Sequence, residues 1–186
     1  WPPPISEQAS EMGIPIKFLD SLFLDDNYLH CFAKSFDYLV CAGCPRVPAN
    51  LVHLMPNRIL NAHPGLLPDF RGLDPVLWAL DNCCTLGATL HFVSEGLDSG
   101  PILIKENLKW QHPSNIFQCR LQCMELCCEL VCRFLATPWS YEPIEQFEKN
   151  ATYWGSFPTW KEKDLLSKML NYCFCEEHGN RYCEKK

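Results

Sequence analysis

ILNAHPGLLPDFRGLDPVLWALDN, residues 59–82, is the stretch of sequence that decides the fold. It begins as an apolar run that ends in polar residues, which is typical of a buried strand that reaches the edge of a sheet. It closes with Asp74, a capping candidate, followed directly by Pro75, and this order is typical of the start of a helix. The prolines and glycines between these two parts predict a tight turn. The stretch therefore predicts a strand, a turn and a helix in succession.

The neighbouring sequence repeats this alternation. FDYLVCAG (36–43) reads as a buried strand closed by a glycine, and Pro48 stands at a plausible first position of the next helix. GATLHFVSE (87–95) alternates as a strand, with GPILIKENLKW (100–110) as its expected neighbour. Strands and helices that alternate with short connections predict an α/β, Rossmann-like fold, in which helices flank a largely parallel sheet.

A long helix is predicted over residues 114–136. Its polar residues recur at steps of three and four and form one stripe: Gln118, Gln122, Glu125, Glu129 and Arg133. Leucines, phenylalanines and cysteines occupy its other faces. We therefore expect the sheet or another subunit to cover this helix, which leaves association of identical chains open.

Composition narrows the class of protein. The chain has 186 residues, of which 47% are hydrophobic and 20% charged, as expected for one soluble globular domain. Its formal net charge of -6 provides no basic surface for nucleic acid. No apolar run reaches the roughly 20 residues of a membrane span, and the start, WPPPISEQ, does not resemble a signal peptide. We expect a cytoplasmic protein that binds neither nucleic acid nor a membrane.

The 13 cysteines lie mainly in apolar, periodic stretches rather than in glycine-rich loops. This placement favours small buried side chains over disulfides or metal ligands. The isolated pair Cys41 and Cys44 is weak evidence for a metal, and so is the row of cysteines on the long helix: Cys119, Cys123, Cys127 and Cys132. A zinc site in the tail is the minor alternative, with four candidate ligands: Cys173, Cys175, His178 and Cys183. We predict no metal requirement.

Polar side chains are expected to meet at one edge of the sheet. Asn61 and His63 end one predicted strand, and Asp98 lies in a glycine-bounded loop after another. Since the carboxyl ends of parallel strands share an edge, a crossover unit between the two would bring the three residues together. An amide, an imidazole and a carboxylate suit transfer of an acyl group. Each residue taken alone also fits a hydrogen-bonded loop, turn or cap position.

Two segments carry distinctive motifs at a set distance. LNAHPGLLPDFRG (60–72) contains Asn-x-His-Pro and Leu-Leu-Pro, and GATLHFVSEGLDSGPIL (87–103) contains Gly-Leu-Asp-x-Gly-Pro. They resemble the signature segments of the folate-dependent formyltransferases, which act on glycinamide ribonucleotide, methionyl-tRNA or amino sugars. The resemblance implies a catalytic domain over residues 1–150 and a C-terminal helical or tail extension over 151–186. It also implies that the family's N-terminal strand and glycine-rich loop are missing before Trp1.

The resemblance implies an enzyme that transfers a formyl group from its co-substrate, 10-formyltetrahydrofolate, to a primary amine. The catalytic asparagine, histidine and aspartate of the family match Asn61, His63 and Asp98. We expect Asn61 and protonated His63 to stabilise the oxyanion, while Asp98 orients His63 or relays a proton. The residues expected to contact the folate are Ala42, Gly43, Val47, Leu66, Leu67, Glu95, Gly96 and Leu97.

The acceptor amine is expected to belong to a small molecule, with a sugar or nucleotide-linked amine as the preferred class. The tRNA enzymes carry a basic barrel after the catalytic domain, whereas only a short segment follows here in a chain of acidic balance. Two alternatives stay open: a truncated or catalytically silent relative that acts as a folate-binding or interaction module, and hydrolysis of 10-formyltetrahydrofolate.

Overall fold

The computed structural model describes residues 4–16, 26–43, 46–109, 115–165, 172–174 and 182–184. The helices are α1 (Ile5–Glu11), α2 (Asp26–Ser35), α3 (Ala49–Leu54), α4 (Pro75–Asp81) and α5 (Ile116–Ala136). The strands are β1 (Leu39–Cys41), β2 (Ile59–His63), β3 (Arg71–Gly72), β4 (Gly87–Phe92), β5 (Ile102–Asn107), β6 (Tyr153–Trp154), β7 (Tyr172–Phe174) and β8 (Tyr182–Glu184). Short 3-10 helices are η1 (Pro138–Ser140), η2 (Glu148–Asn150) and η3 (Thr159–Lys161).

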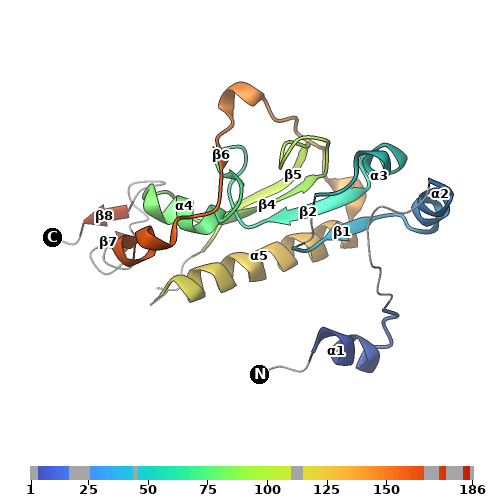
Figure 1. The fold of residues 1–186 in the computed structure, drawn as a ribbon, viewed down its shortest axis with the longest axis horizontal. Coiled ribbons are helices and arrows are strands. Elements are labelled where there is room, and N and C mark those ends of the chain that lie inside the picture. Colours follow the sequence, from blue (N-terminus) through green and yellow to red (C-terminus); the bar gives the residue numbers. More distant parts are fainter. Residues whose placement is uncertain are drawn as a thin grey trace.

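A four-stranded sheet in the order β1-β2-β4-β5 forms the centre of the molecule (Figure 1). β1 pairs with β2 in parallel, whereas β2 with β4 and β4 with β5 are antiparallel. The α/β class with flanking helices is as predicted, but over these four strands the sheet is mixed rather than largely parallel. The loop over 93–101 is too short for a helical crossover, so β5 returns beside β4 in the opposite direction.

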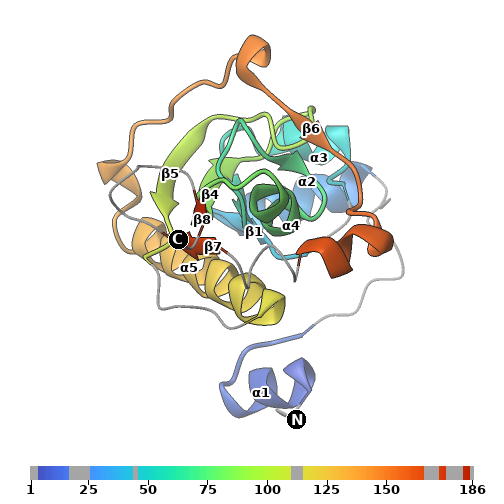
Figure 2. The ribbon, with the colours of Figure 1, turned by 90° about the vertical axis from the view of Figure 1, so that its left-hand side faces the viewer.

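α5 covers one face of this sheet (Figure 2). Its first turn is capped by Asn115, whose side chain accepts a hydrogen bond from the Gln118 backbone N–H at 2.9 Å. The core between helix and sheet is formed by Leu60, Ala88, Leu90, Phe92, Leu103, Ile104, Leu126, Cys127, Leu130 and Phe134. Alternate residues of β2 and β4 point into this layer, which leaves the other residues of both strands on the opposite face.

A second apolar stripe of α5 points away from the sheet. Phe117 is 72% exposed, and the other members of this stripe include Leu121, Met124 and Leu135. The expectation that the sheet or another subunit covers the helix thus holds for one stripe, whereas the second is uncovered in the single chain.

Residues 152–157 run alongside the sheet and pack onto α4. β6 pairs in parallel with β3, matching Arg71 with Tyr153 and Gly72 with Trp154. The rings of Trp78 and Trp154 stack with their centroids 4.5 Å apart. The buried core of this region contains Phe70, Val76, Leu77, Ala79, Leu80, Leu86, Cys119, Cys123, Phe157 and Leu165. The described part of the segment after residue 150 therefore shares a core with the residues before it.

α2 and α3 cover the start of β2 on the sheet face opposite α5. Leu29, Leu51 and Met55 are buried there against Ile59. Beyond residue 165 only β7 and β8 are described, and they pair with each other as an antiparallel ribbon. Within the described ranges, none of the helices combines the length and apolar character that a membrane span requires.

Candidate active site

Four polar side chains occupy the sheet face opposite α5. In the register of β2 and β4, Asn61 stands opposite His91, and His63 opposite Thr89. Their neighbours Leu60 and Leu90 point into the core under α5. Because successive residues of a strand face opposite sides, this alternation presents an amide, two imidazoles and a hydroxyl on one surface.

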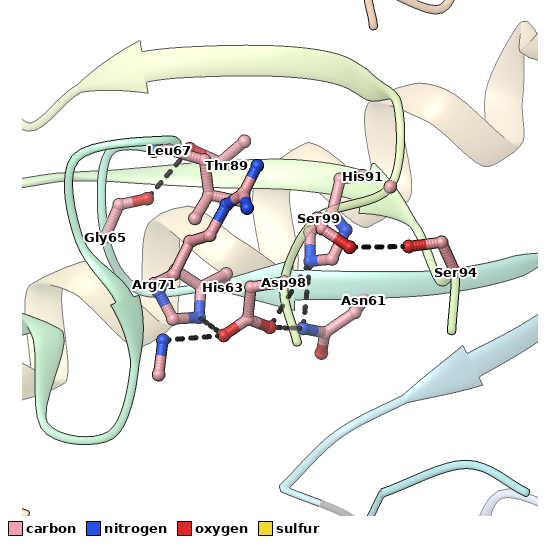
Figure 3. Close-up of polar contacts among 12 residues, drawn as sticks. Asn61, His63, Gly65, Leu67, Arg71, Thr89, His91, Ser94, Asp98 and Ser99 are labelled. Carbon is pink, nitrogen blue, oxygen red and sulfur yellow. Dashed lines mark hydrogen bonds and ion pairs between the residues drawn. The ribbon is translucent and has the colours of Figure 1, made fainter. Parts of the chain in front are cut away.

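Asp98 completes this cluster from the loop between β4 and β5 (Figure 3). Its Oδ1 accepts a hydrogen bond from Asn61 Nδ2 at 3.3 Å, and its Oδ2 accepts one from the Gly72 backbone N–H at 2.8 Å. Oδ2 lies 3.7 Å from His63 Nδ1, and Oδ1 lies 3.7 Å from His91 Nε2. One carboxylate thus lies within 4 Å of Asn61, His63 and His91, while only 10% of its own side chain is exposed.

The hydrogen bonds assign the protons on both imidazole rings. His63 Nε2 lies 2.6 Å from the Phe70 carbonyl oxygen, which can only accept, so Nε2 carries a proton. Its Nδ1 then faces Asp98 and lies beyond hydrogen-bond distance of the carboxylate. His91 Nδ1 donates in the same way to the Phe92 carbonyl at 2.8 Å. The lone pair of His91 Nε2 is therefore free to accept from Asn61 Nδ2, which lies 3.1 Å away.

Burial keeps His91 in its neutral form. Removal from water lowers the pKa of His91 to about 4, although the nearby Asp98 carboxylate opposes this shift. At neutral pH the ring is uncharged and holds one hydrogen of the Asn61 amide, while Asp98 holds the other. The Asn61 amide therefore has a fixed orientation.

The family of the chain follows from comparison of its sequence with known proteins. Residues 20–115, about half of the chain, match the family described as formyl transferase. The chain belongs to the formyl transferase family. This range contains Asn61, His63 and Asp98, so the side-chain cluster lies inside the matched segment.

Relatives include a methionyl-tRNA formyltransferase from Deinococcus radiodurans, 31% identical over 82% of this chain and 49% of the relative. The chain thus spans about half the length of that relative. A phosphoribosylglycinamide formyltransferase from Bacillus halodurans has a TM-score of 0.57 at 27% identity, covering 68% of this chain and 70% of the other.

A third similarity concerns the fold alone. The formyltransferase PseJ from Anoxybacillus kamchatkensis, solved in complex with UDP-4,6-dideoxy-4-formamido-L-AltNAc and tetrahydrofolate, has a TM-score of 0.67 at 18% identity. The match covers 90% of this chain and 94% of that structure. Together these relatives place the α/β domain among folds that are used for formyl transfer.

The structure brings the three residues that we predicted to be catalytic together, although by a different route than expected. We predicted a parallel crossover that would place Asn61 and Asp98 at a common carboxyl edge. β2 and β4 are antiparallel instead, so β4 ends beside the start of β2. The loop after β4 then folds back across the sheet face, and this return carries Asp98 to Asn61 and His63.

The two loops predicted to contact folate are joined by polar contacts. Arg46 Nη2 donates to the Glu95 carbonyl at 2.5 Å, and His53 Nε2 lies 2.8 Å from Glu95 Oε1. Val47 packs against the same apolar cluster as Val93. Ala42, Gly43, Glu95, Gly96 and Leu97 are exposed around these contacts. Six of the eight predicted folate residues therefore lie on two loops that are bonded to each other.

Leu66 and Leu67 occupy a different place. Leu67 is completely buried, its backbone N–H donates to Thr89 Oγ1 at 3.1 Å, and its carbonyl accepts from Lys105 Nζ at 3.0 Å. Leu66 lines a pocket of about 320 Å³ together with Phe70 and Trp154. Leu67 therefore belongs to the core here, and Leu66 borders a cavity formed with the C-terminal segment.

His91 and the Gly72 N–H are parts of the cluster that the sequence prediction missed. A signal for His91 was present, because Thr89 and His91 interrupt an otherwise apolar strand at alternate positions. The contribution of Gly72 had no such signal, since any non-proline residue offers a backbone N–H.

The described residues contain no group of three or more His, Cys, Asp or Glu side chains arranged to hold a metal ion. Cys119, Cys123 and Cys127 are buried as predicted, and burial raises their thiol pKa values to about 11, 12 and 12. Cys132 is exposed instead. Cys44, Cys175 and His178 lie outside the described residues, and with them the pair Cys41 and Cys44, which we declined as a metal site, and the minor alternative of a zinc site in the tail.

Proposed function

We propose that this formyl transferase moves the formyl group of 10-formyltetrahydrofolate to the primary amine of a small acceptor. The observation that carries the proposal is the Asp98 carboxylate, which contacts both Asn61 and His63 within the segment that matches the family. An amide, an imidazole and a carboxylate in contact supply the hydrogen-bond donors and the proton acceptor that acyl transfer needs.

Each residue has a separate role in this proposal. The amine nitrogen attacks the formyl carbon, and the carbonyl electron pair moves to the formyl oxygen. His63 acts in its protonated form: Nε2–H stays bonded to the Phe70 carbonyl, while Nδ1–H, together with Asn61 Nδ2–H, donates to that oxygen as it becomes negative. Asn61 does so by giving up its 3.3 Å hydrogen bond to Asp98, which is longer than its 3.1 Å contact with His91. Asp98 accepts the amine proton, which passes to the folate nitrogen as the bond from that nitrogen to the formyl carbon breaks.

The residues at the two joined loops fit a folate. Leu97 is 51% exposed and offers apolar surface next to Asp98 in sequence. Gly43 has a positive φ of 61°, and among the described residues other than its chain neighbours no atom lies within 4 Å of the position a Cβ would take. Gly43 itself presents no side chain to a flat ring that approaches the backbone there. Tetrahydrofolate in the structure of PseJ supports the same donor class.

For the acceptor we propose an amine of a small molecule, with a sugar or nucleotide-linked amine preferred. The chain carries a net charge of -6, which does not favour a polyanionic partner. The sugar nucleotide in the PseJ structure supports this choice. Methionyl-tRNA is the second candidate, because the curated relatives include methionyl-tRNA formyltransferases. A cytoplasmic location and association of identical chains stay predictions.

Incubation with 10-formyltetrahydrofolate tests the proposal directly. We expect tetrahydrofolate to be released only when an amino sugar nucleotide or another small amine is present, with the formamide as the second product. Tetrahydrofolate release that requires methionyl-tRNA would identify methionyl-tRNA, the second candidate, as the acceptor. Release without any amine would indicate hydrolysis. No release in any mixture, together with retained folate binding, would contradict catalysis and favour a binding module.

Replacement of Asn61 by alanine removes one oxyanion donor. We expect turnover to fall by about 10² to 10³-fold, the usual effect of losing such a donor, with little change in thermal unfolding. Asn50→Ala, on the exposed side of α3, is the matched amide control and should keep wild-type turnover. Full activity of Asn61→Ala would remove Asn61 from the site.

A further inference from the structure

Gln146 lies between the C-terminal segment and the Asp98 loop. Its Nε2 donates to the carbonyl oxygens of Asp98 at 3.0 Å and Gly100 at 2.7 Å. Its Oε1 accepts from Arg71 Nε at 3.2 Å and Nη2 at 2.9 Å. A side-chain amide has two hydrogens to donate and two lone pairs to accept with, so its hydrogen-bonding capacity is fully used.

The partners of Gln146 permit a single orientation of its amide. A guanidinium only donates, so Oε1 must face Arg71, and carbonyl oxygens only accept, so Nε2 must face the loop. Arg71 is fully buried and is held in turn by Glu148 Oε1 at 2.7 Å and by the Tyr153 hydroxyl at 2.6 Å. The hydrogen bond from Arg71 lowers the pKa of Glu148 and keeps it ionised. Gln146 is thus bonded to a buried, charged side chain that has two further hydrogen-bond partners.

The backbone of Asp98 needs such support. Its φ of 46° lies in the left-handed region, which costs a residue with a side chain energy unless its surroundings hold it. Gly100 packs so closely that an added Cβ would lie 1.9 Å from the Phe92 carbonyl oxygen. Gln146 bonds the carbonyls of both residues and so fixes the loop conformation that aims the Asp98 carboxylate at Asn61 and His63.

We propose that Gln146 is a positioning residue of the active site, which holds the Asp98 carboxylate in place through the backbone of its loop. The expected effect on turnover rests on the proposed function. The claim that Gln146 holds the Asp98 loop does not depend on that function. Gln146 reaches no proposed reacting atom, so it acts through Asp98. Residues of the C-terminal segment thereby contribute to a site whose reacting groups all lie before residue 99.

Gln146→Glu is the sharpest test, because it keeps the bond with Arg71 and replaces the two donors by a carboxylate oxygen. That oxygen would face the carbonyls of Asp98 and Gly100 and repel them. We expect kcat to fall by up to about a hundredfold, with the KM for the formyl donor nearly unchanged. The neighbouring, exposed Glu145→Gln makes the reverse exchange and should keep wild-type kcat.

A second readout does not depend on activity. The Gly72 N–H donates to Asp98 Oδ2, so its amide proton resonance reports the position of the carboxylate. We expect this resonance to move upfield and exchange faster in Gln146→Glu, but not in Glu145→Gln. If Gln146→Glu does not fold, Gln146→Met is the second variant, because it removes the two donors without adding charge, although it also removes the acceptor for Arg71.

The outcomes separate the two proposals. Wild-type kcat and an unchanged Gly72 resonance in the Gln146 variant would overturn the positioning role. If the wild-type protein transfers no formyl group, the proposed function fails, and the Gly72 resonance alone decides the role of Gln146. A perturbed resonance then supports positioning, and an unperturbed one rejects it.

Discussion

The stability of the protein depends on the protonation of His91. Its pKa is about 4 in the folded chain, against an ordinary value of 6.5. Between these values the unfolded chain binds a proton that the folded chain does not, so stability falls as the pH drops from about 6.5 to about 4. Below that range both states are protonated, and this residue causes no further loss.

Replacement of His91 by glutamine should remove this dependence while keeping an acceptor for Asn61. We expect the wild-type protein to lose on the order of 3 kcal/mol through His91 across this pH range, and His91→Gln to lose correspondingly less. Urea unfolding at several pH values measures the difference. His53→Gln is the control, because the His53 side chain is 68% exposed. Equal slopes for wild type and His91→Gln would contradict a buried neutral ring.

The three residues of the proposed site could be named from the sequence, whereas the residues that support them could not. Asn61, His63 and Asp98 were recognisable because each stands at a chemically distinctive position in a motif. The supporting role of Arg71 could not be predicted from the sequence. A charged side chain is expected at the surface, and this one is fully buried. Gln146 gives no local signal either, since its role depends on contacts with residues about 50 positions away.

Among the elements, α5 shows how a helix divides its surface between core and exterior. Leu130 is completely buried between α5 and the sheet, whereas Leu121 on the same helix is 46% exposed. Leu130→Ala should lower the free energy of unfolding by about 2 to 5 kcal/mol, because it leaves a cavity in a packed layer. Leu121→Ala should change it by about 0.5 kcal/mol or less, unless a second molecule covers that stripe. Chemical denaturation of both variants decides between these outcomes.

The same elements show what local pattern can and cannot predict. The helix expected over 114–136 is found as Ile116–Ala136, and the strand expected over 87–95 as Gly87–Phe92, because periodicity is a local property. The direction of β4 against β2 was not predicted correctly. It depends on where a long connection returns, and the connection over 64–86 is long enough for either direction.

At the scale of the whole molecule, Gly72 is one of the places where the C-terminal segment contacts the candidate active site, because it pairs with Trp154 and its N–H donates to Asp98. Its φ is 101°, and an added Cβ would lie 2.2 Å from the Trp154 carbonyl oxygen. Gly72→Ala should therefore cost about 2 kcal/mol or more through backbone strain and the clash, and it should separate β3 from β6. Gly155→Ala, with no atom within 4 Å of its Cβ, is the matched control.

The effect of Gly72→Ala should be visible in two measurements, the thermal unfolding of the variant and its rate of formyl transfer. Gly72→Ala is expected to lose stability and turnover, because the displaced segment carries Gln146 and the shifted N–H no longer holds Asp98. Wild-type stability of Gly72→Ala would show that the pairing of β3 with β6 contributes little to the fold.

The bonds among Arg71, Asp98 and Gln146 also set an order of events during synthesis on the ribosome. A nascent chain that ends near residue 140 already contains Asn61, His63 and Asp98, yet it lacks the amide that secures the loop. We therefore expect the Asp98 loop to be held in place only after residues 146–153 have left the exit tunnel.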